Sequence, residues 1–374
     1  MFSFKLISMD MRMATEADQH LSAYDHSTLS AINMCPTWGI LTRSMQKKMP
    51  NTKRSMALEA GSTSHEGFAA IRLYQYMFHD AKTCAEKLIC IEHGQRLFGR
   101  DRFSRMGSVL DETATERTNT INFAIEAIES SGFYDDITDR KRTLSNITES
   151  IISYIDAYDM TRYPLWIRDS DDAETDIGIE IPFDIVVTIK YQTTRHECNY
   201  NVINSHSKPL EEIELVARFI GKLDGLHYNK GELIVIEDKS GSRLDDAWLS
   251  QWVLSHQITG YCLAASTFTG LSCNHALVSG MRIPIGRVPA EGIRKEYVPR
   301  TPIMFEKWAN WFVTTIQLEQ QYINNVVEAP MYTHSCNRYF SRCSLLPFCA
   351  ADTVEEKLAI IEEMDDDDWS PLND

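Results

Sequence analysis

The stretch Gly221–Ser242, GKLDGLHYNKGELIVIEDKSGS, predicts the centre of a β-sheet. Residues 233–236 form a short, β-branched apolar run, which is typical of a buried strand. The run stops abruptly at the charged triplet 237–239. Side chains alternate along a strand, so Glu237 and Lys239 share one face and Asp238 takes the other.

A second strand, 215–226, precedes this one, and Asn229-Lys230-Gly231 between them is a hairpin signal. With a two-residue loop, Asn229 pairs with Glu232, and Asp224 falls directly opposite Glu237. Opposed side chains have Cβ atoms about 5 Å apart, where like charges are destabilising. A divalent cation bound between the two carboxylates is the simplest way to offset this repulsion. A three-residue loop would shift the register, and a surface hairpin would point the charges into water.

Length and composition indicate a soluble, globular chain with two lobes or one elaborated domain. It has 374 residues, 43% hydrophobic and 24% charged. We expect no membrane-spanning stretch and no secretory signal. Nine cysteines without a secretion signal favour a reducing, cytoplasmic compartment and metal or structural roles for the thiols.

The charge pattern is uneven. The formal net charge of −16 argues against a general affinity for nucleic acid, although part of it lies in an acidic tail ending MDDDDWSPLND. Such a tail is either solvated or, as the less favoured reading, a partner-binding peptide. The basic clusters are Arg43/Lys47/Lys48/Lys53/Arg54 and Arg140-Lys141-Arg142.

The order of periodic patterns predicts the fold class. Helical spacing occurs before Pro164, strand spacing from about Asp176, and mixed elements thereafter. The expected helices are 27–34, one from Gly61–Ser64, 82–99, 115–131, 143–158, 245–265 and 301–327, and the expected strands are 177–189, 215–226, 232–239 and 274–285. We therefore predict an α/β (α+β mixed) protein, with a central mixed sheet flanked by helices and an N-terminal helical region.

Three cysteines close to the C-terminus indicate a second metal site. Cys336, Cys343 and Cys349 lie within fourteen residues, which suggests soft-metal ligation. A closed zinc site or an iron–sulfur cluster needs four thiolates, and Cys35 would be the fourth if the fold brings the chain ends together. Three independent buried cysteines remain the alternative.

Taken together, these motifs resemble the PD-(D/E)XK nuclease superfamily, in particular its RecB-type branch. GSTSHEGF matches the histidine motif, GKLDGL the aspartate motif, IEDKSG the E-x-K motif and QITGY the Q-x-x-x-Y motif. LSAINMCPTW and the C-terminal cysteines resemble the iron–sulfur staple of AddB-like and CRISPR-associated adaptation nucleases. The gap between Cys336 and Cys343 is six residues where those families usually have two, and it resembles variants of phage-encoded members.

The resemblance implies a restriction-endonuclease-like core and a Mg²⁺- or Mn²⁺-dependent deoxyribonuclease. The catalytic residues would be Asp224, Glu237 and Lys239. The metal ligands would be His65, Asp224, Glu237 and the backbone carbonyl of Asp238. Such a metal lowers the pKa of a bound water, and Lys239 would orient that water and stabilise developing charge.

The resemblance also implies that Gln257 and Tyr261 bind the DNA strand, and that Cys35, Cys336, Cys343 and Cys349 hold a structural 4Fe-4S cluster, with zinc as the less favoured occupant. The expected partners are single-stranded DNA or duplex ends, a helicase or recombination protein, and a second copy of the chain. A phage-encoded protein would work in the host cytoplasm, in DNA repair or recombination.

Five regions follow from this interpretation. They are an N-terminal segment with the first cysteine (1–60), a helical region with the histidine motif (61–165), the nuclease core (166–330), a cysteine segment (331–350) and the acidic tail (351–374). The competing hypothesis is an iron–sulfur, DNA-binding scaffold that has kept the fold without catalysis. An intact Asp224/Glu237/Lys239 set favours the enzyme over the scaffold.

Overall fold

The computed structural model describes residues 2–50, 55–81, 83–136, 139–157, 165–166, 177–195, 211–241, 243–283, 292–336, 342–367 and 370. Two compact units form, each assembled from segments far apart in the sequence. Unit 1 comprises 1–53, 183–221 and 302–374, and unit 2 comprises 54–182 and 222–301. Lys53 and Arg54, which the sequence analysis placed in a basic cluster, lie outside the described residues.

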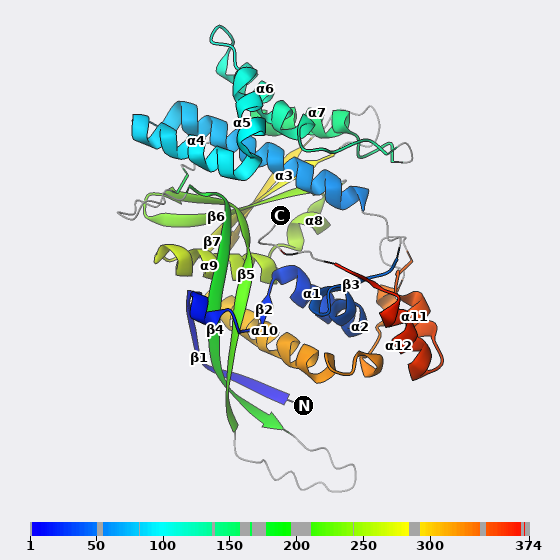
Figure 1. The fold of residues 1–374 in the computed structure, drawn as a ribbon. Coiled ribbons are helices and arrows are strands. Elements are labelled where there is room, and N and C mark those ends of the chain that lie inside the picture. Colours follow the sequence, from blue (N-terminus) through cyan, green and yellow to red (C-terminus); the bar gives the residue numbers. More distant parts are fainter. Residues whose placement is uncertain are drawn as a thin grey trace, which may run out of the picture. The chain divides into compact units, whose positions relative to one another are not determined.

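The expected central mixed sheet flanked by helices is confirmed (Figure 1). Its seven strands follow the order β1-β4-β5-β6-β7-β8, with β2 paired to β5. The strands are β1 (Phe2–Met13), β2 (Ala23–Tyr24), β4 (Ile179–Arg195), β5 (Glu211–Asn229), β6 (Glu232–Gly241), β7 (His275–Arg282) and β8 (Ile293–Pro299). β6 runs parallel to β7 and β2 parallel to β5, whereas the pairs β1–β4, β5–β6 and β7–β8 are antiparallel.

The β5–β6 hairpin forms as predicted. Asn229 pairs with Glu232, and the two loop residues Lys230 and Gly231 both have positive φ, at 51° and 90°. This is the backbone of a type I′ turn, whose twist matches that of the strands it joins. Glycine adopts it without strain, and Lys230 accepts an unusual conformation for a residue with a side chain.

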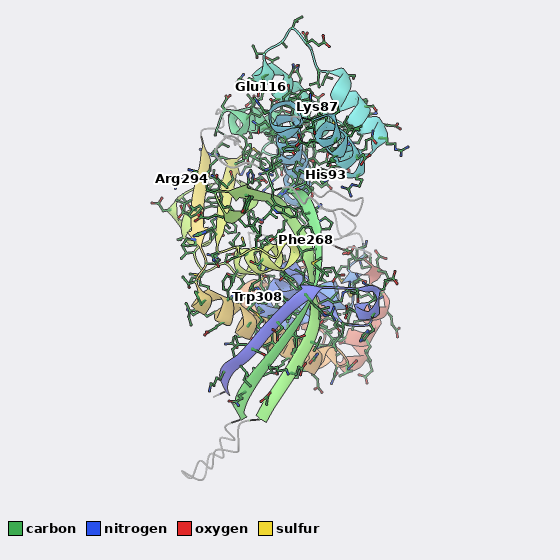
Figure 2. The ribbon with its side chains drawn as sticks, turned by 90° about the vertical axis from the view of Figure 1, so that its left-hand side faces the viewer. Lys87, His93, Glu116, Phe268, Arg294 and Trp308 are labelled. Atoms are coloured by element: carbon green, nitrogen blue, oxygen red, sulfur yellow. The ribbon has the colours of Figure 1, made fainter. Side chains whose placement is uncertain are left out.

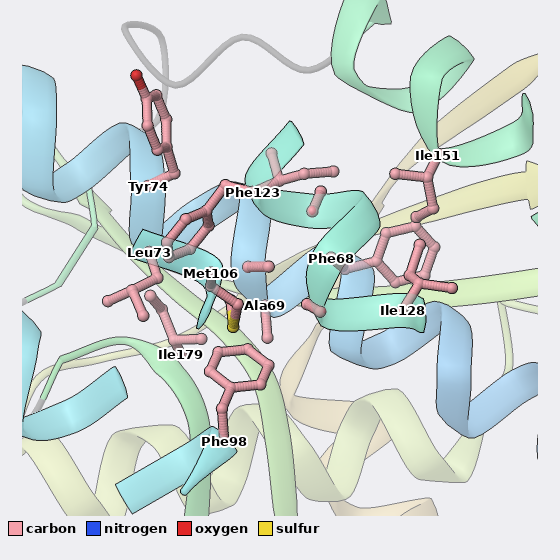
Figure 3. Packing of buried hydrophobic residues seen from close by; sticks show 14 of the residues in the cluster. Phe68, Ala69, Leu73, Tyr74, Phe98, Met106, Phe123, Ile128, Ile151 and Ile179 are labelled. Carbon is pink, nitrogen blue, oxygen red and sulfur yellow. The ribbon is translucent and has the colours of Figure 1, made fainter. Parts of the chain in front are cut away.

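Unit 2 packs five helices over its strands. They are α3 (Met56–Gln75), α4 (Cys84–Phe98), α5 (Arg100–Ser108), α6 (Glu116–Glu129) and α7 (Leu144–Ala157). Figure 3 shows their shared core, in which Phe68 of α3 lies beside Ile128 and Ile151, and Phe123 beside Leu73. A Cβ on Gly67 would lie 2.7 Å from Ile151 Cδ1, so a glycine here lets α3 and α7 approach closely.

The predicted start of α3 was wrong. The helix begins at Met56, so Gly61–Ser64 lies inside it. The hydroxyl of Ser64 donates to the carbonyl of Ala60 at 2.7 Å, which satisfies it within the helix instead of capping an end. His65 is therefore an interior helical residue, held by a full turn on either side.

The single helix predicted at 245–265 is instead two. α8 (Asp246–Ser250) ends before α9 (His256–Thr269) begins, and Ser255 caps α9 through Ile258 N–H. The buried guanidinium of Arg300 binds the carbonyls of Trp252, Val253 and Ser255, at 2.8–3.4 Å. Those carbonyls are the groups that a continuous helix would have used, so Arg300 stabilises the break.

Unit 1 contains β1, a long strand that the sequence analysis missed, as it also missed β2 and, in unit 2, β8. The pairing of β1 with β4 runs from Phe2–Arg195 to Met13–Ile185. Its remaining long elements are α1 (His26–Met34) and α10 (Pro302–Tyr322), both near their predicted bounds. Short elements complete it: α2 (Pro36–Gly39), π-helix Ile40–Ser44, β3 (Lys47–Lys48), α11 (Leu346–Ala350), α12 (Val354–Glu362) and β9 (Asp365–Asp366). None of the described helices is long and apolar enough to cross a membrane.

Candidate metal and catalytic site

The hairpin in unit 2 brings Asp224 next to the charged triplet. The β5–β6 ladder ends with Gly225 opposite Ile236, and the next residues along the two strands are Asp224 and Glu237. Asp224 Oδ2 accepts the backbone N–H of Asp238 at 2.7 Å. Both carboxylates are shielded from water, with side-chain exposures of 11% for Asp224 and 1% for Glu237.

Helix α3 and strand β4 complete an acidic group around Asp224. His65 Nδ1 lies 3.3 Å from Asp224 Oδ1 and 3.9 Å from Glu180 Oε1. Each of these three residues offers a ligand atom, and the three atoms all lie within 4.8 Å of one another. Among the described residues, this is the one set of three acid, histidine or cysteine ligand atoms that meets that distance.

Glu180, on strand β4, is the third member of this group and was not among the ligands expected from the sequence. It has φ of +48°, an uncommon conformation for a residue with a Cβ, and it is 8% exposed. Lys222 Nζ lies 3.2 Å from its Oε2, while Oε1 is buried without a hydrogen-bond partner among the described residues. Strained backbone of this kind persists where the surroundings hold it, and functional sites are where it concentrates.

Lys239 forms an ion pair with Glu237 Oε1, as expected for two residues on one strand face. Gln257 Nε2 donates to the same oxygen at 2.8 Å and lies 3.3 Å from the Tyr261 hydroxyl. The other oxygen, Glu237 Oε2, is buried and has no hydrogen-bond partner among the described residues. Lys239 Nζ also lies 6.0 Å from the ring centre of Trp252, a cation–π distance.

The carboxylates differ in their affinity for protons. Burial raises the pKa of Glu237, and the charge of Asp224 raises it further, to about 7 despite Lys239. Burial also raises the pKa of Asp224, but His65, Lys239 and the Asp238 N–H outweigh it and lower the value to about 2. Burial lowers the pKa of His65, while Asp224 and Glu180 together raise it well above its ordinary value. A cation is thus strongly favoured among these groups.

Asp238 turns to the opposite face of the sheet. Its carboxylate forms a fully buried ion pair with Arg72 of α3 and accepts the Tyr154 hydroxyl at 2.9 Å. Arg72 Nη2 also donates to that hydroxyl at 3.2 Å, and Nη1 reaches the Asp224 carbonyl at 3.4 Å. Arg72 is seven residues after His65, hence on the same helix face, and an arginine in the apolar run AAIRLY was the sequence signal for it.

The four predicted cluster cysteines lie in unit 1. Cys35 is buried where α1 ends, and the other three are partly exposed. Cys343 N–H donates to the Cys336 carbonyl at 2.8 Å. Burial first, and then the charges of the other three cysteines, raise the pKa of Cys349 to about 11. The structure thus places the four thiols close enough to interact, although no three of these described sulfur atoms lie within 4.8 Å of one another.

Hydrogen bonds tie the segments that carry these cysteines together. The Ser335 hydroxyl donates to the Met34 carbonyl, and the Thr37 hydroxyl to the Ala329 carbonyl, both at 2.9 Å. Cys343 and Cys349 pack against a small apolar cluster that includes Leu41 and Phe348. Outside this group, Cys90, Cys262 and Cys273 are buried and Cys84 is exposed.

Comparison with known proteins adds little to this geometry. No family model matches the chain, and no curated protein matches it. Among solved structures, one that it is similar to is entitled "Crystal structure of SSO0001", with 17% identity and a TM-score of 0.23. That match covers 41% of this chain and 59% of the other. A likeness this weak indicates neither a shared fold nor a shared function.

Proposed function

We propose that the protein is a divalent-metal-dependent deoxyribonuclease that hydrolyses phosphodiester bonds. The observation that carries the proposal is the set of ligand atoms from His65, Glu180 and Asp224, within 4.8 Å of one another and beside Glu237. Glu180 Oε1 and Glu237 Oε2 are buried and accept no hydrogen bond from the described residues. Buried carboxylate oxygens without donors are costly, and Mg²⁺ or Mn²⁺ supplies what they lack.

The chain's own residues suit this chemistry. A bound divalent ion supplies a water of lowered pKa and neutralises charge on a phosphate. His65, Glu180, Asp224 and Glu237 would hold it, and the carbonyl of Asp238, predicted as a further ligand, stays a prediction. Lys239 lies on the Glu237 face and can hold a water or a phosphate oxygen by its charge. Gln257 keeps Glu237 in place through its hydrogen bond.

The cysteine group supports a structural iron–sulfur cluster in the same proposal. Thiols that raise one another's pKa are relieved when metal neutralises their charge. Four thiolates suit either a closed zinc site or an iron–sulfur cluster. The resemblance of the cysteine segments to an iron–sulfur staple favours the cluster. Its role would be to hold the N-terminal and C-terminal segments of unit 1 together.

The experiment is a cleavage assay on the full chain. Labelled single-stranded and duplex DNA are incubated with Mn²⁺ or Mg²⁺, with a chelator as the blank, and end-labelled and circular substrates separate exonuclease from endonuclease action. Lys239→Ala should lower the rate by about 100-fold or more. Lys87→Ala, an exposed lysine on α4 (Figure 2), is the matched control and should cut as the parent does. DNA that stays intact with either metal, or a Lys239→Ala variant that cuts normally, favours the non-catalytic scaffold.

A further inference from the structure

The acidic tail of unit 1 pairs with a basic segment of the same unit. β3 and β9 form a two-stranded antiparallel sheet in which Lys47 pairs with Asp366 and Lys48 with Asp365. The backbone N–H of Asp367 donates to the Gln46 carbonyl at 2.8 Å and extends the pairing by one residue. The described tail residues are therefore paired through their backbone, although the side chains of Asp365 and Asp366 stay exposed.

Charge reinforces the pairing. Lys47 Nζ lies 2.5 Å from Asp366 Oδ1, and Lys48 Nζ lies 3.7 Å from Asp367 Oδ1. The hydrogen bond and charge of Lys47 lower the pKa of Asp366. Arg43, at the end of the preceding helical turn, lines a cavity of about 350 Å³ together with Gln46 and Ser370. Lys47 and Lys48 thus meet the acidic residues 365–367, and Arg43 precedes them in the same segment.

The contact between the tail and these lysines is weak enough for another negatively charged chain to displace it. The side chains of Asp366 and Lys48 are 79% and 46% exposed, and exposed ion pairs contribute little to stability. A sheet of two short strands is marginal in water by itself. A partner with more negative charge, and with a comparable extended shape, can therefore compete with the tail for the same lysines.

The shape of the tail indicates which partner that is. Asp365–Asp367 carries one carboxylate per residue along an extended strand, with Asp366 on the Lys47 face and Asp365 and Asp367 on the Lys48 face. A single-stranded nucleic acid is likewise an extended chain, with one negative charge per nucleotide. We propose that Arg43, Lys47 and Lys48 form a contact surface for the phosphate backbone of DNA, which the chain's own Asp365–Asp367 strand covers until DNA displaces it. The inference rests on the proposed function, since that function makes DNA the polyanion. It also explains how a chain with net charge −16 engages DNA at a local basic surface.

The test measures binding without cleavage. The full chain carrying Asp365→Asn, Asp366→Asn and Asp367→Asn is titrated with a fluorescent single-stranded oligonucleotide in chelator, over a range of salt. The matched control carries Glu355→Gln, Glu362→Gln and Glu363→Gln, which removes the same charge from exposed residues with no ion pair among the described residues. The Asp variant should bind about 10-fold tighter than the control at low salt. Its affinity should fall more steeply with salt, by about one to two in the logarithmic slope, because two lysines are released.

Two further measurements make each outcome decisive. Lys47→Gln with Lys48→Gln should abolish the gain in the Asp background, and a synthetic peptide of residues 364–374 should compete with DNA for the Asp variant. The single charge reversal Asp366→Lys should reproduce part of the gain if the triple variant folds poorly. Equal affinities of the Asp variant and the control overturn the inference even if the parent cleaves DNA. Tighter binding with no cleavage overturns the nuclease and leaves the surface standing.

Discussion

Arg72 and Asp238 form an ion pair in which neither side chain is exposed to water. The pair joins helix α3, which carries His65, to strand β6, which carries Glu237 and Lys239. Tyr154 bonds to both partners, so the two buried charges are satisfied within the contact between the helix and the strand. The position of His65 over Asp224 thus depends on a contact seven residues further along its own helix.

Removing one member of this pair should be costly. Arg72→Met leaves Asp238 buried without its cation, and we expect a loss of about 3–5 kcal/mol in the free energy of unfolding. Urea denaturation measures it. Arg72→Met combined with Asp238→Leu should recover part of the loss, because no lone charge stays buried. The control is the exposed pair Arg117–Asp156, where Arg117→Gln should cost less than about 1 kcal/mol. Equal losses at both pairs would contradict the role given to Arg72.

Metal binding should be visible as stability. An ion that binds only the folded state at about 100 times its dissociation constant adds about 2.7 kcal/mol. We expect Mn²⁺ to raise the thermal unfolding midpoint of the parent, and Asp224→Asn or Glu180→Gln to remove most of that increase. Asp184→Asn, which breaks an ion pair with Arg218 in unit 1, should keep it. An increase that survives at Asp224→Asn would place the ion elsewhere.

His93 should make stability depend on pH. Burial first, and then the charge of Arg96, lower its pKa to about 4, while Nε2–H donates to the Ile179 carbonyl at 3.0 Å. The unfolded chain binds this proton below about pH 6.5 and the folded chain only near pH 4, so stability falls as the pH falls through that window. For a partly exposed ring we expect a loss of about 1–2 kcal/mol.

Denaturation at pH 7 and pH 4.5 checks this dependence. His93→Gln should reduce the difference between the two conditions, and His20→Gln, an exposed histidine in unit 1, should leave it as in the parent. Since Ile179 precedes Glu180, the same variant should also weaken the Mn²⁺-dependent stabilisation. A His93→Gln variant with an unchanged pH dependence would assign the acid sensitivity to other groups.

Replacing any one of the four grouped cysteines should remove the whole metal cluster. Cys349→Ser or Cys35→Ser should each remove the visible absorbance of anaerobically purified protein and its bound iron and sulfide, because a cluster needs all four thiolates. Cys84→Ser, at an exposed cysteine outside the group, should change neither. Colourless parent protein that carries zinc by elemental analysis would support the zinc-stapled alternative.

Local patterns predicted the central hairpin and most helices well. The apolar run before Glu237, the Asn229-Lys230-Gly231 turn and the alternation of side chains are all short-range signals, and the structure follows them. By contrast, β1 forms because the distant strand β4 pairs with it, and the break between α8 and α9 depends on Arg300, some 45 positions away. No pattern within either segment carries that information.

In the candidate site, too, the sequence could place some residues and not others. Asp224, Glu237 and Lys239 could be placed relative to one another because one hairpin carries all three. Glu180 could not, since its direction follows from a positive φ that the surrounding fold imposes. Arg72 was visible only as a charge in an apolar helical run, and the residue it neutralises is 166 positions further along the chain.

The two-residue loop at Lys230-Gly231 also limits how this protein can vary. A strand that slips by one residue exchanges its two faces, so Asp238 would enter the site and Glu237 would meet Arg72. An inserted residue near this turn that shifts the pairing therefore removes the acid, lysine and ion pair together. Related chains that keep the chemistry should conserve the length of this loop more strictly than the identity of its residues.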